Sequence, residues 1–206
     1  MSPLYTAALQ GFLLGAGLII AIGAQNAFIL KQGLKREYVF ALSTFCFLSD
    51  ALLIVAGTAG MGTLVSSNPT FTKIAAIGGG LFLIWFGFNS FRSAFKGESL
   101  SASKESSPKS LWKAIALVAA LTWLNPHVYL DTVVMLGSIA GQHPTDERIY
   151  FAGGAVIASM AWFYTLGYGA AWLAPIFAKP ISWKILDFGI GIVMWLIAYS
   201  LMITLL

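Results

Sequence analysis

The chain has 206 residues, of which 58% are hydrophobic and only 10% are charged, and its mean hydropathy is +0.82. A water-soluble domain carries about 25% charged residues, so this composition excludes a soluble globular protein. Apolar runs of roughly 20 residues, without the short alternating segments of a membrane β-barrel, indicate an all-α integral membrane protein. The net charge of +4 comes from basic residues between these runs, which favours membrane topology signals over nucleic-acid binding.

Six apolar segments follow one another and are predicted to be transmembrane helices. The first is too long for the apolar region of a cleaved signal peptide, and no basic residue precedes Lys31. Cys46 is the single cysteine and excludes an intramolecular disulfide, so it is expected to act as a small hydrophobe. The predicted spans are 4–30, 38–60, 71–95, 111–139, 149–177 and 185–206.

Turn-forming residues separate the predicted spans, and the only long connection is polar. The Ser/Lys-rich stretch 98–110 is predicted to be a flexible cytoplasmic loop without an active site. The turns are marked by Lys31-Gln32-Gly33, Asn68-Pro69, Gly97 to Pro108, His143-Pro144 and Lys179-Pro180.

The basic residues predict the orientation, because cytoplasmic loops are enriched in Lys and Arg. Only Lys73 and Arg148 lie on one side of the predicted spans. Six spans with both termini outside fit this bias, whereas a five-span protein requires one apolar run to be discarded. The other ten of the 12 basic residues are Lys31, Lys35, Arg36, Arg92, Lys96, Lys104, Lys109, Lys113, Lys179 and Lys184.

The two halves of the chain resemble each other weakly. Ser49 matches Ser159 and Trp85 matches Trp195 at a constant offset, while Asn26 corresponds to Asn125 once loop lengths are allowed for. With three spans in each half, the halves would be inverted repeats in the membrane, an architecture common in carriers. The prediction is one transporter domain over 1–206, with repeats at about 1–97 and 110–206.

Two polar interruptions are predicted to break helices one and four. Gly23-Ala24-Gln25-Asn26 lies near the inner end of the first span, and Trp123-Leu124-Asn125-Pro126-His127 lies within the fourth. Pro126 removes a backbone donor and disfavours a helical conformation at Asn125. Backbone groups freed by such breaks must be satisfied by protein or water, and in carriers they contact the substrate. The simpler alternative is a structural kink whose freed backbone groups are satisfied by Asn125 and a neighbouring helix.

Asp50 lies near the middle of the second span, and Asp131 lies in the outer half of the fourth. A charge at the centre of a membrane helix costs about 2.5–3.5 kcal/mol on insertion scales, so such residues face the bundle interior or a water-filled cavity and are functional candidates. An ion pair is the structural alternative, but Lys31, the nearest basic residue, is expected to mark a cytoplasmic end.

The neighbours of Asp131 add a polar stripe. Asn125, Tyr129 and Thr132 are expected to share one helical face, with Thr122 one turn earlier. His127 precedes Asp131 by four residues, so the pair is a possible proton relay, although a packing hydrogen bond suits His127 equally. The sequence shows no metal-ligand cluster and no nucleophile–base pair, so no metal, cofactor or enzyme activity is predicted.

These motifs resemble those of the LysE/ArgO family of basic amino-acid exporters. Ile22-Gly23-Ala24-Gln25-Asn26-Ala27-Phe28, followed by Lys31-Gln32-Gly33, is similar to its first signature, and Leu48-Ser49-Asp50 to its second-span motif. Thr122 to Thr132 resembles its most specific signature, particularly that of the arginine exporters. The family usually has proline where this chain has Ala24, which bears on how sharply the first span is broken.

The resemblance implies proton-coupled export of L-lysine, L-arginine or close analogues from the cytoplasm, across a bacterial inner membrane. It assigns substrate binding or proton coupling to a polar set within the spans. Separately, the Gly-rich faces of the third and sixth predicted spans could pack within one chain or between two chains of a homodimer. The alternatives are export of neutral amino acids or an inorganic cation, an ion channel, or an intramembrane enzyme. The polar set comprises Asp50, Asp131, Gln25, Asn26, Asn125 and Tyr129, with Gly23 and Pro126 as helix breaks and His127 as a possible relay.

Overall fold

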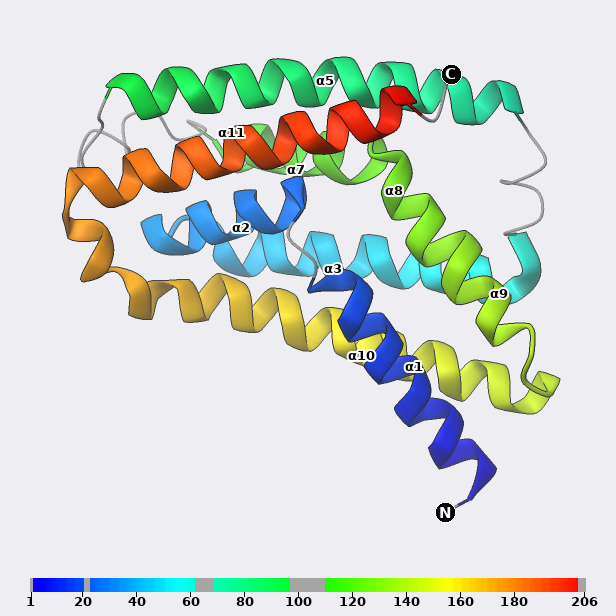
Figure 1. Ribbon diagram of the computed structural model, residues 1–206. Helices are drawn as coiled ribbons and strands as arrows, with labels where there is room; N and C mark the ends of the chain where they lie inside the picture. Colours follow the sequence, from blue (N-terminus) through cyan, green and yellow to red (C-terminus); the bar gives the residue numbers. More distant parts are fainter. Residues whose placement is uncertain (1, 21–22, 62–68, 97–109, 204–206) are drawn as a thin grey trace.

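The computed structural model describes residues 2–20, 23–61, 69–96 and 110–203, and all regular structure in these ranges is helical (Figure 1). The expected loop 98–110 lies outside them except for Ser110, whose side chain caps the helix that follows. In chain order the elements are α1 (Pro3–Ile19), α2 (Ala24–Lys35), α3 (Val39–Ala56), the π-helical η1 (Gly57–Met61), α5 (Pro69–Lys96), α7 (Leu111–Trp123), α8 (Pro126–Val128), the π-helical η2 (Tyr129–Met135), α9 (Leu136–Ala140), α10 (Thr145–Gly169), the 3-10 turns η3 (Ala170–Leu173) and η4 (Ile176–Ala178), and α11 (Pro180–Ile203).

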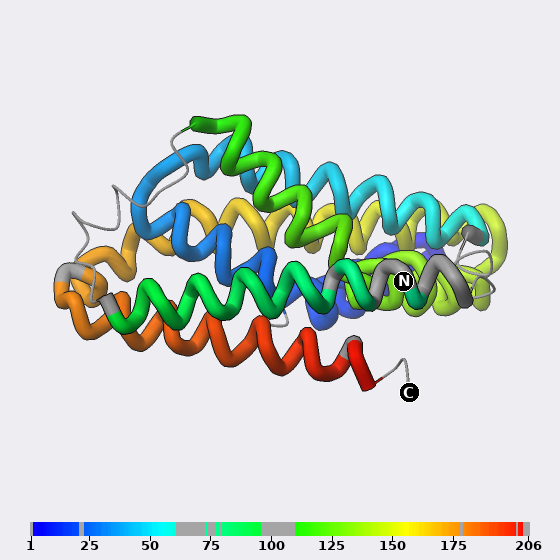
Figure 2. Tube along the Cα trace, turned by 90° about the horizontal axis from the view of Figure 1, so that it is seen from above, coloured from blue at the N-terminus to red at the C-terminus, as the bar shows by residue number. Residues whose placement is uncertain are grey.

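Two long helix pairs organise the bundle. Helices α5 and α11 run side by side along one edge, and α1 packs along α10, which also contacts α3 (Figures 1 and 2). Besides the adjoining turn η4, this pair contacts α2 and α8, and its buried residues share one apolar core cluster with α2, α3, α7 and α10. The pair therefore forms one side of the bundle and is part of its core.

Glycines allow the closest helix contacts. A Cβ on Gly11 of α1 would overlap the Phe151 carbonyl oxygen of α10, and one on Gly154 of α10 would overlap the Ala8 carbonyl oxygen of α1. Small residues let membrane helices approach closely, because packing there replaces the hydrophobic effect as the main driving force. The α1–α10 contact thus depends on backbone meeting backbone.

The outer surface is apolar, as expected for a protein surrounded by lipid. Leu52 is 60% exposed, and Trp112 and Trp172 are still more exposed. Four described helices are long and apolar enough to cross a membrane: Pro3–Ile20, Val39–Gly60, Thr145–Leu173 and Pro180–Ser200. The chain is therefore a helical integral membrane protein, as the composition indicated.

The structure corrects the expected end of the first span. Lys31-Gln32-Gly33 was predicted to be a turn, but these residues lie inside α2, which continues to Lys35. The helix continues because its polar residues are buried against other helices, and a Cβ on Gly33 would overlap the Gly167 carbonyl oxygen. The turn comes at Arg36, which ends the helix in the left-handed conformation.

Other boundaries also differ from the expected ones. Pro180 is the first residue of α11 and not part of a turn, since proline at a helix start loses no helical hydrogen bond. The α-helical part of the fifth segment runs from Thr145 to Gly169 and then tightens into 3-10 turns.

Candidate functional site

The first predicted helix break is present between Ile19 and Ala24. Gly23 is extended and caps α2 without a side-chain hydrogen bond. Asn26 Nδ2 donates to the Ile19 carbonyl oxygen over 2.8 Å, which satisfies an acceptor at the end of α1. Trp162 Nε1 of α10 donates to Asn26 Oδ1 over 3.2 Å. Asn26 therefore joins both halves of the broken helix to α10.

The second break lies between Trp123 and Pro126. Asn125 is extended, and its Oδ1 accepts a hydrogen bond from the His127 backbone N–H over 3.1 Å, so it caps α8. Pro126 is the first residue of α8, where its missing donor costs no helical bond. The Tyr129 hydroxyl donates to the Trp123 carbonyl oxygen over 2.9 Å, which satisfies an acceptor at the end of α7.

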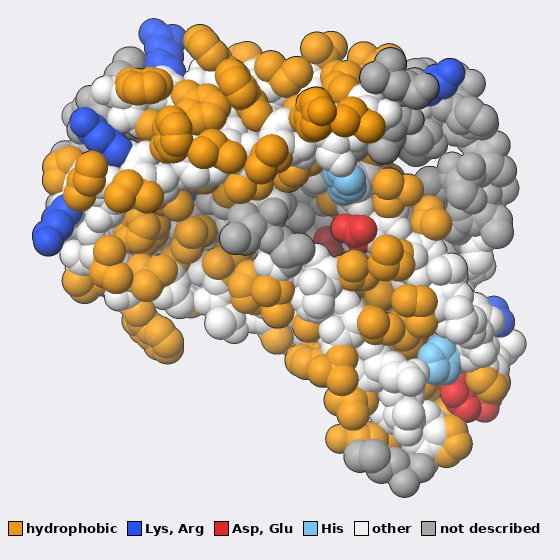
Figure 3. All heavy atoms as spheres, in the orientation of Figure 1, with side chains coloured by type: hydrophobic (Ala, Val, Ile, Leu, Met, Phe, Trp, Pro, Cys, Tyr) orange, Lys and Arg blue, Asp and Glu red, His pale blue; other side chains and the backbone are white. Residues whose placement is uncertain are grey.

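Both breaks open into one cavity of about 370 Å³. This volume lies within the range of small-molecule pockets, roughly 300–1,000 Å³. On the face in Figure 3, acidic and histidine side chains lie in a hollow between hydrophobic ones. The lining residues are Leu18, Ile19, Gly23, Ala24, Gln25, Asn26, Asp50, Asn125, His127, Val128, Asp131, Thr132, Phe163, Leu196, Ile197 and Ser200.

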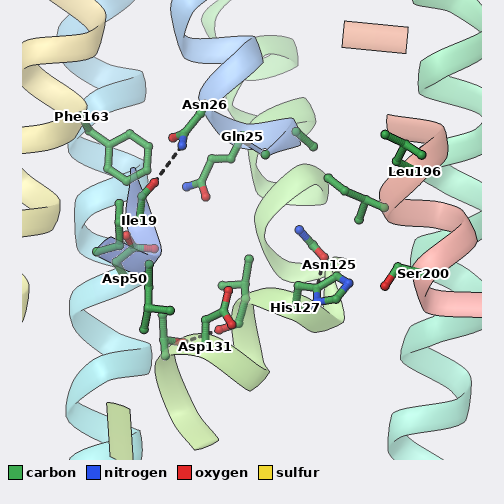
Figure 4. Close-up of a pocket in the computed structure, with 16 residues that line it drawn as sticks. Ile19, Gln25, Asn26, Asp50, Asn125, His127, Asp131, Phe163, Leu196 and Ser200 are labelled. Carbon is green, nitrogen blue, oxygen red and sulfur yellow. Dashed lines mark hydrogen bonds between the residues drawn. The ribbon is translucent and has the colours of Figure 1, made fainter. Parts of the chain in front are cut away.

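The two predicted aspartates reach this cavity from different elements, Asp50 from α3 and Asp131 from η2 (Figure 4). Asp50 is buried, and its Oδ2 accepts a hydrogen bond from Ser159 Oγ of α10 over 2.7 Å. Asp131 is partly buried. Within the described ranges, neither carboxylate forms an ion pair. The cavity therefore has two acids without a Lys or Arg partner, and His127 is the one basic side chain in its described lining, which is an environment suited to a cation.

Gln25 supplies an amide beside the acids. Its side chain points toward the space that Asp50 and Asp131 face (Figure 4). Gln25 Nε2 is buried, and in the described part of the chain its side chain interacts only with the Cys46 thiol, a weak acceptor. This nitrogen is therefore suited to a stronger acceptor on a bound molecule.

The expected polar stripe around Asp131 is wrong as a single helical face. Asn125 and Thr132 line the cavity, whereas Thr122 and Tyr129 do not. Thr122 Oγ1 donates to the Val118 carbonyl oxygen, and the Tyr129 hydroxyl is engaged at the break. The stripe assumed a continuous α-helix, but the chain is broken before Pro126 and turns π-helical at Tyr129.

His127 and Asp131 line the same cavity and interact electrostatically. Both residues are described, and no hydrogen bond joins the imidazole to the carboxylate. The π-helical turn changes the spacing on which a contact four residues apart depends. The relay role of His127 stays a prediction.

A third acid, Asp187, was not among the residues predicted from the sequence. It is buried in α11, where its Oδ1 lies 2.7 Å from Lys31 Nζ and its Oδ2 accepts from Ser93 Oγ over 2.7 Å. The signal was present, since Asp187 is an acid within the predicted span 185–206. Lys31 was read as a marker of the membrane surface, which hid the pairing.

Broken helices that meet at a central cavity with unpaired acids define the class of secondary transporters. The chain belongs to the LysE type translocator family, whose sequence model matches residues 16–205. It is therefore a transporter and not an enzyme.

The chain is also similar over nearly its whole length to proteins named arginine exporter protein ArgO. The relative from Yersinia enterocolitica is 44% identical over 193 residues, covering 94% of each chain. Those from Serratia proteamaculans and Pectobacterium carotovorum are 43% and 44% identical, covering 94% of this chain in both cases. No solved structure matches this chain.

Proposed function

We propose that the protein is a secondary active exporter of basic amino acids, L-arginine or L-lysine, from the bacterial cytoplasm across the inner membrane. The names of its relatives support the substrate class. The observation that carries the proposal is the meeting of Asp50, Asp131 and both helix breaks in one cavity. A cationic side chain needs an acidic partner in a low dielectric, and these two carboxylates form no ion pair within the described ranges.

The other end of the substrate meets amides. The α-carboxylate binds near the start of α2, where Gly23 provides no side-chain cap and the first backbone N–H groups are available to an anion. Gln25 Nε2, buried beside the weakly accepting Cys46 thiol, donates a further hydrogen bond. Asn125 lines the same cavity from the second break. Tyr129, engaged with Trp123, contributes by holding that break.

Protons provide the driving force. Moving one positive charge out against a negative interior costs about 2.3 kcal/mol per 100 mV. Exchange of the cation for a proton on a carboxylate cancels this electrical work. Asp50 and Asp131 thus bind either the substrate or protons, and the exchange couples export to the proton-motive force.

The chain crosses the membrane six times with both termini outside, as two inverted repeats. Two observations support this topology. Lys and Arg side chains gather at the end of the bundle where α2 ends and α11 begins (Figure 3). The start of α1 and the end of α11 lie toward the opposite end (Figure 1). In this arrangement α5 and α11 are the last helices of the two repeats.

Counterflow in liposomes loaded with unlabelled arginine tests the function. Labelled arginine and lysine should accumulate uphill in exchange, whereas citrulline, the uncharged analogue of arginine, should not. Preferential counterflow of a neutral amino acid, or uptake of a divalent cation, would replace the proposed substrate. Purely downhill flux would indicate a channel.

Variants of the two acids test the site. Asp50→Asn and Asp131→Asn should each lower arginine counterflow at least 10-fold and change its dependence on external pH. The matched control is Asp146→Asn, since Asp146 is an exposed acid at the start of α10. Wild-type rates and an unchanged pH profile in both cavity variants would overturn the assignment.

A further inference from the structure

A partly buried ion pair joins three helices away from the cavity. Lys31 Nζ of α2 lies 2.7 Å from Asp187 Oδ1 of α11, and Ser93 Oγ of α5 donates to Asp187 Oδ2 over 2.7 Å. Helix α11 contacts α2 directly, and the two helices share one apolar core cluster. The ion pair is therefore a polar tie at the α2–α11 contact.

The ion pair lies between the cavity and the basic end of the bundle. Along α2, Lys31 comes five residues after the cavity residue Asn26, and along α11, Asp187 comes nine residues before Leu196, or about 14 Å at 1.5 Å per residue. Between these positions the two helices contribute buried apolar residues to one core cluster. They include Ala27 and Phe28 of α2 and Ile190 and Met194 of α11.

The two partners differ in their access to water. The Lys31 side chain is 21% exposed, whereas that of Asp187 is 4% exposed. A lysine can extend its ammonium to the surface along its flexible stem, but a buried aspartate cannot follow. Lys35, one turn further along α2, is over the Trp183 ring, 6.0 Å from its centroid. If Lys31 leaves, Asp187 needs another cation, because an unpaired buried charge is strongly destabilising.

We propose that Asp187 is a second cation-binding site, on the cytoplasmic side, where the side chain of the basic amino acid replaces the Lys31 ammonium. This proposal rests on the proposed function. A guanidinium can form two parallel hydrogen bonds with the carboxylate, which a single ammonium cannot. When Lys31 is displaced, the polar tie between α2 and α11 is lost, and α11 can shift relative to α2. The arriving cation thus opens its own route from the cytoplasmic side toward Asp50 and Asp131.

Chemical labelling of Lys31 tests this site on the wild-type protein in detergent. Acetylation by N-hydroxysuccinimide acetate, followed by mass spectrometry, measures how freely the Lys31 amine meets water. The probe n-butylguanidinium should raise Lys31 acetylation several-fold, and its neutral counterpart n-butylurea should not. Lys184, exposed on α11, is the internal control and should react equally in all samples. Unchanged Lys31 acetylation with n-butylguanidinium would overturn the proposal.

Transport by a variant that lacks both charges of the pair distinguishes cation binding at Asp187 from a purely structural role of the ion pair. Lys31→Met/Asp187→Asn removes both charges together, so no buried charge is left unpaired and the protein should still fold. Its arginine half-saturation concentration at the cytoplasmic side should rise at least 10-fold. A wild-type value in the folded double variant would show that the pair only stabilises the bundle. If the wild-type protein shows no counterflow of arginine or lysine, the proposed function fails, and labelling by n-butylguanidinium still decides whether Asp187 binds cations.

Discussion

Ser159 Oγ of α10 donates a hydrogen bond to Asp50 Oδ2 of α3 over 2.7 Å, with both residues buried. The bond joins a candidate substrate acid to a helix that does not itself carry an acid in the cavity lining. A hydrogen bond to a charged group contributes about 1.5–3 kcal/mol. Ser159 is therefore expected to stabilise the charged form of Asp50, the form that binds a cation.

Ser159→Ala should raise the arginine half-saturation concentration about 10-fold, because about 1.4 kcal/mol corresponds to a factor of ten in affinity. Initial rates of counterflow over a range of arginine concentrations provide the measurement. Ser43→Ala is the matched control, since Ser43 Oγ joins the same two helices by donating to the Phe163 carbonyl oxygen over 3.0 Å. Equal shifts in both variants would show that Ser159 acts only through helix packing.

The sequence predicted the helix breaks well because their causes are local. Pro126 and the preceding Asn125 determine the second break by themselves, and Gly23 marks the first. The assignment of the two cavity acids also followed from a local fact, the presence of a carboxylate in an apolar span. Their meeting in one cavity depends on how α3 and η2 pack, which no local pattern contains.

The pairing of Lys31 with Asp187 shows what the sequence hid. The two residues lie at opposite ends of the chain, and each stands near the edge of an apolar run. Such positions usually mark a membrane surface, so the hydropathy pattern alone gives no reason to bury them. Only the packing of α2 against α11 makes them partners. The π-helical turn at Tyr129 also could not be predicted, because the spacings used to place side chains on a helical face assume an α-helix.

Asn26→Ala should lower the stability of the folded protein by about 1–3 kcal/mol, because it leaves the Ile19 carbonyl and the Trp162 indole without their partner. Thermal unfolding in detergent, followed by circular dichroism, measures the effect. Asn89→Ala is the control, since Asn89 Nδ2 bonds a carbonyl of its own unbroken helix at an exposed position. A loss no greater than that of Asn89→Ala would contradict the role of Asn26 at the break.

Tyr129→Phe tests whether the Tyr129 hydroxyl stabilises the helix break before Pro126 or binds the substrate. The change removes the donor to the Trp123 carbonyl oxygen and should lower stability by about 0.5–1.5 kcal/mol. The arginine half-saturation concentration should stay within two-fold, because Tyr129 does not line the cavity. Denaturation curves and counterflow assays on the same preparation give both values. A large rise in the arginine half-saturation concentration without loss of stability would indicate that Tyr129 contacts the substrate.

Gly11→Ala and Gly17→Ala should have opposite effects, although both glycines lie in α1. A Cβ on Gly11 would overlap the Phe151 carbonyl oxygen of α10, whereas one on Gly17 would meet no atom within 4 Å. Overpacking costs about 1–3 kcal/mol, so Gly11→Ala should destabilise the protein by forcing α1 away from α10. Gly17→Ala should instead be neutral or stabilising by up to about 1 kcal/mol, because alanine favours the helix. Unfolding temperatures of the two variants compare them directly, and equal values would mean that α1 does not pack on α10 through Gly11.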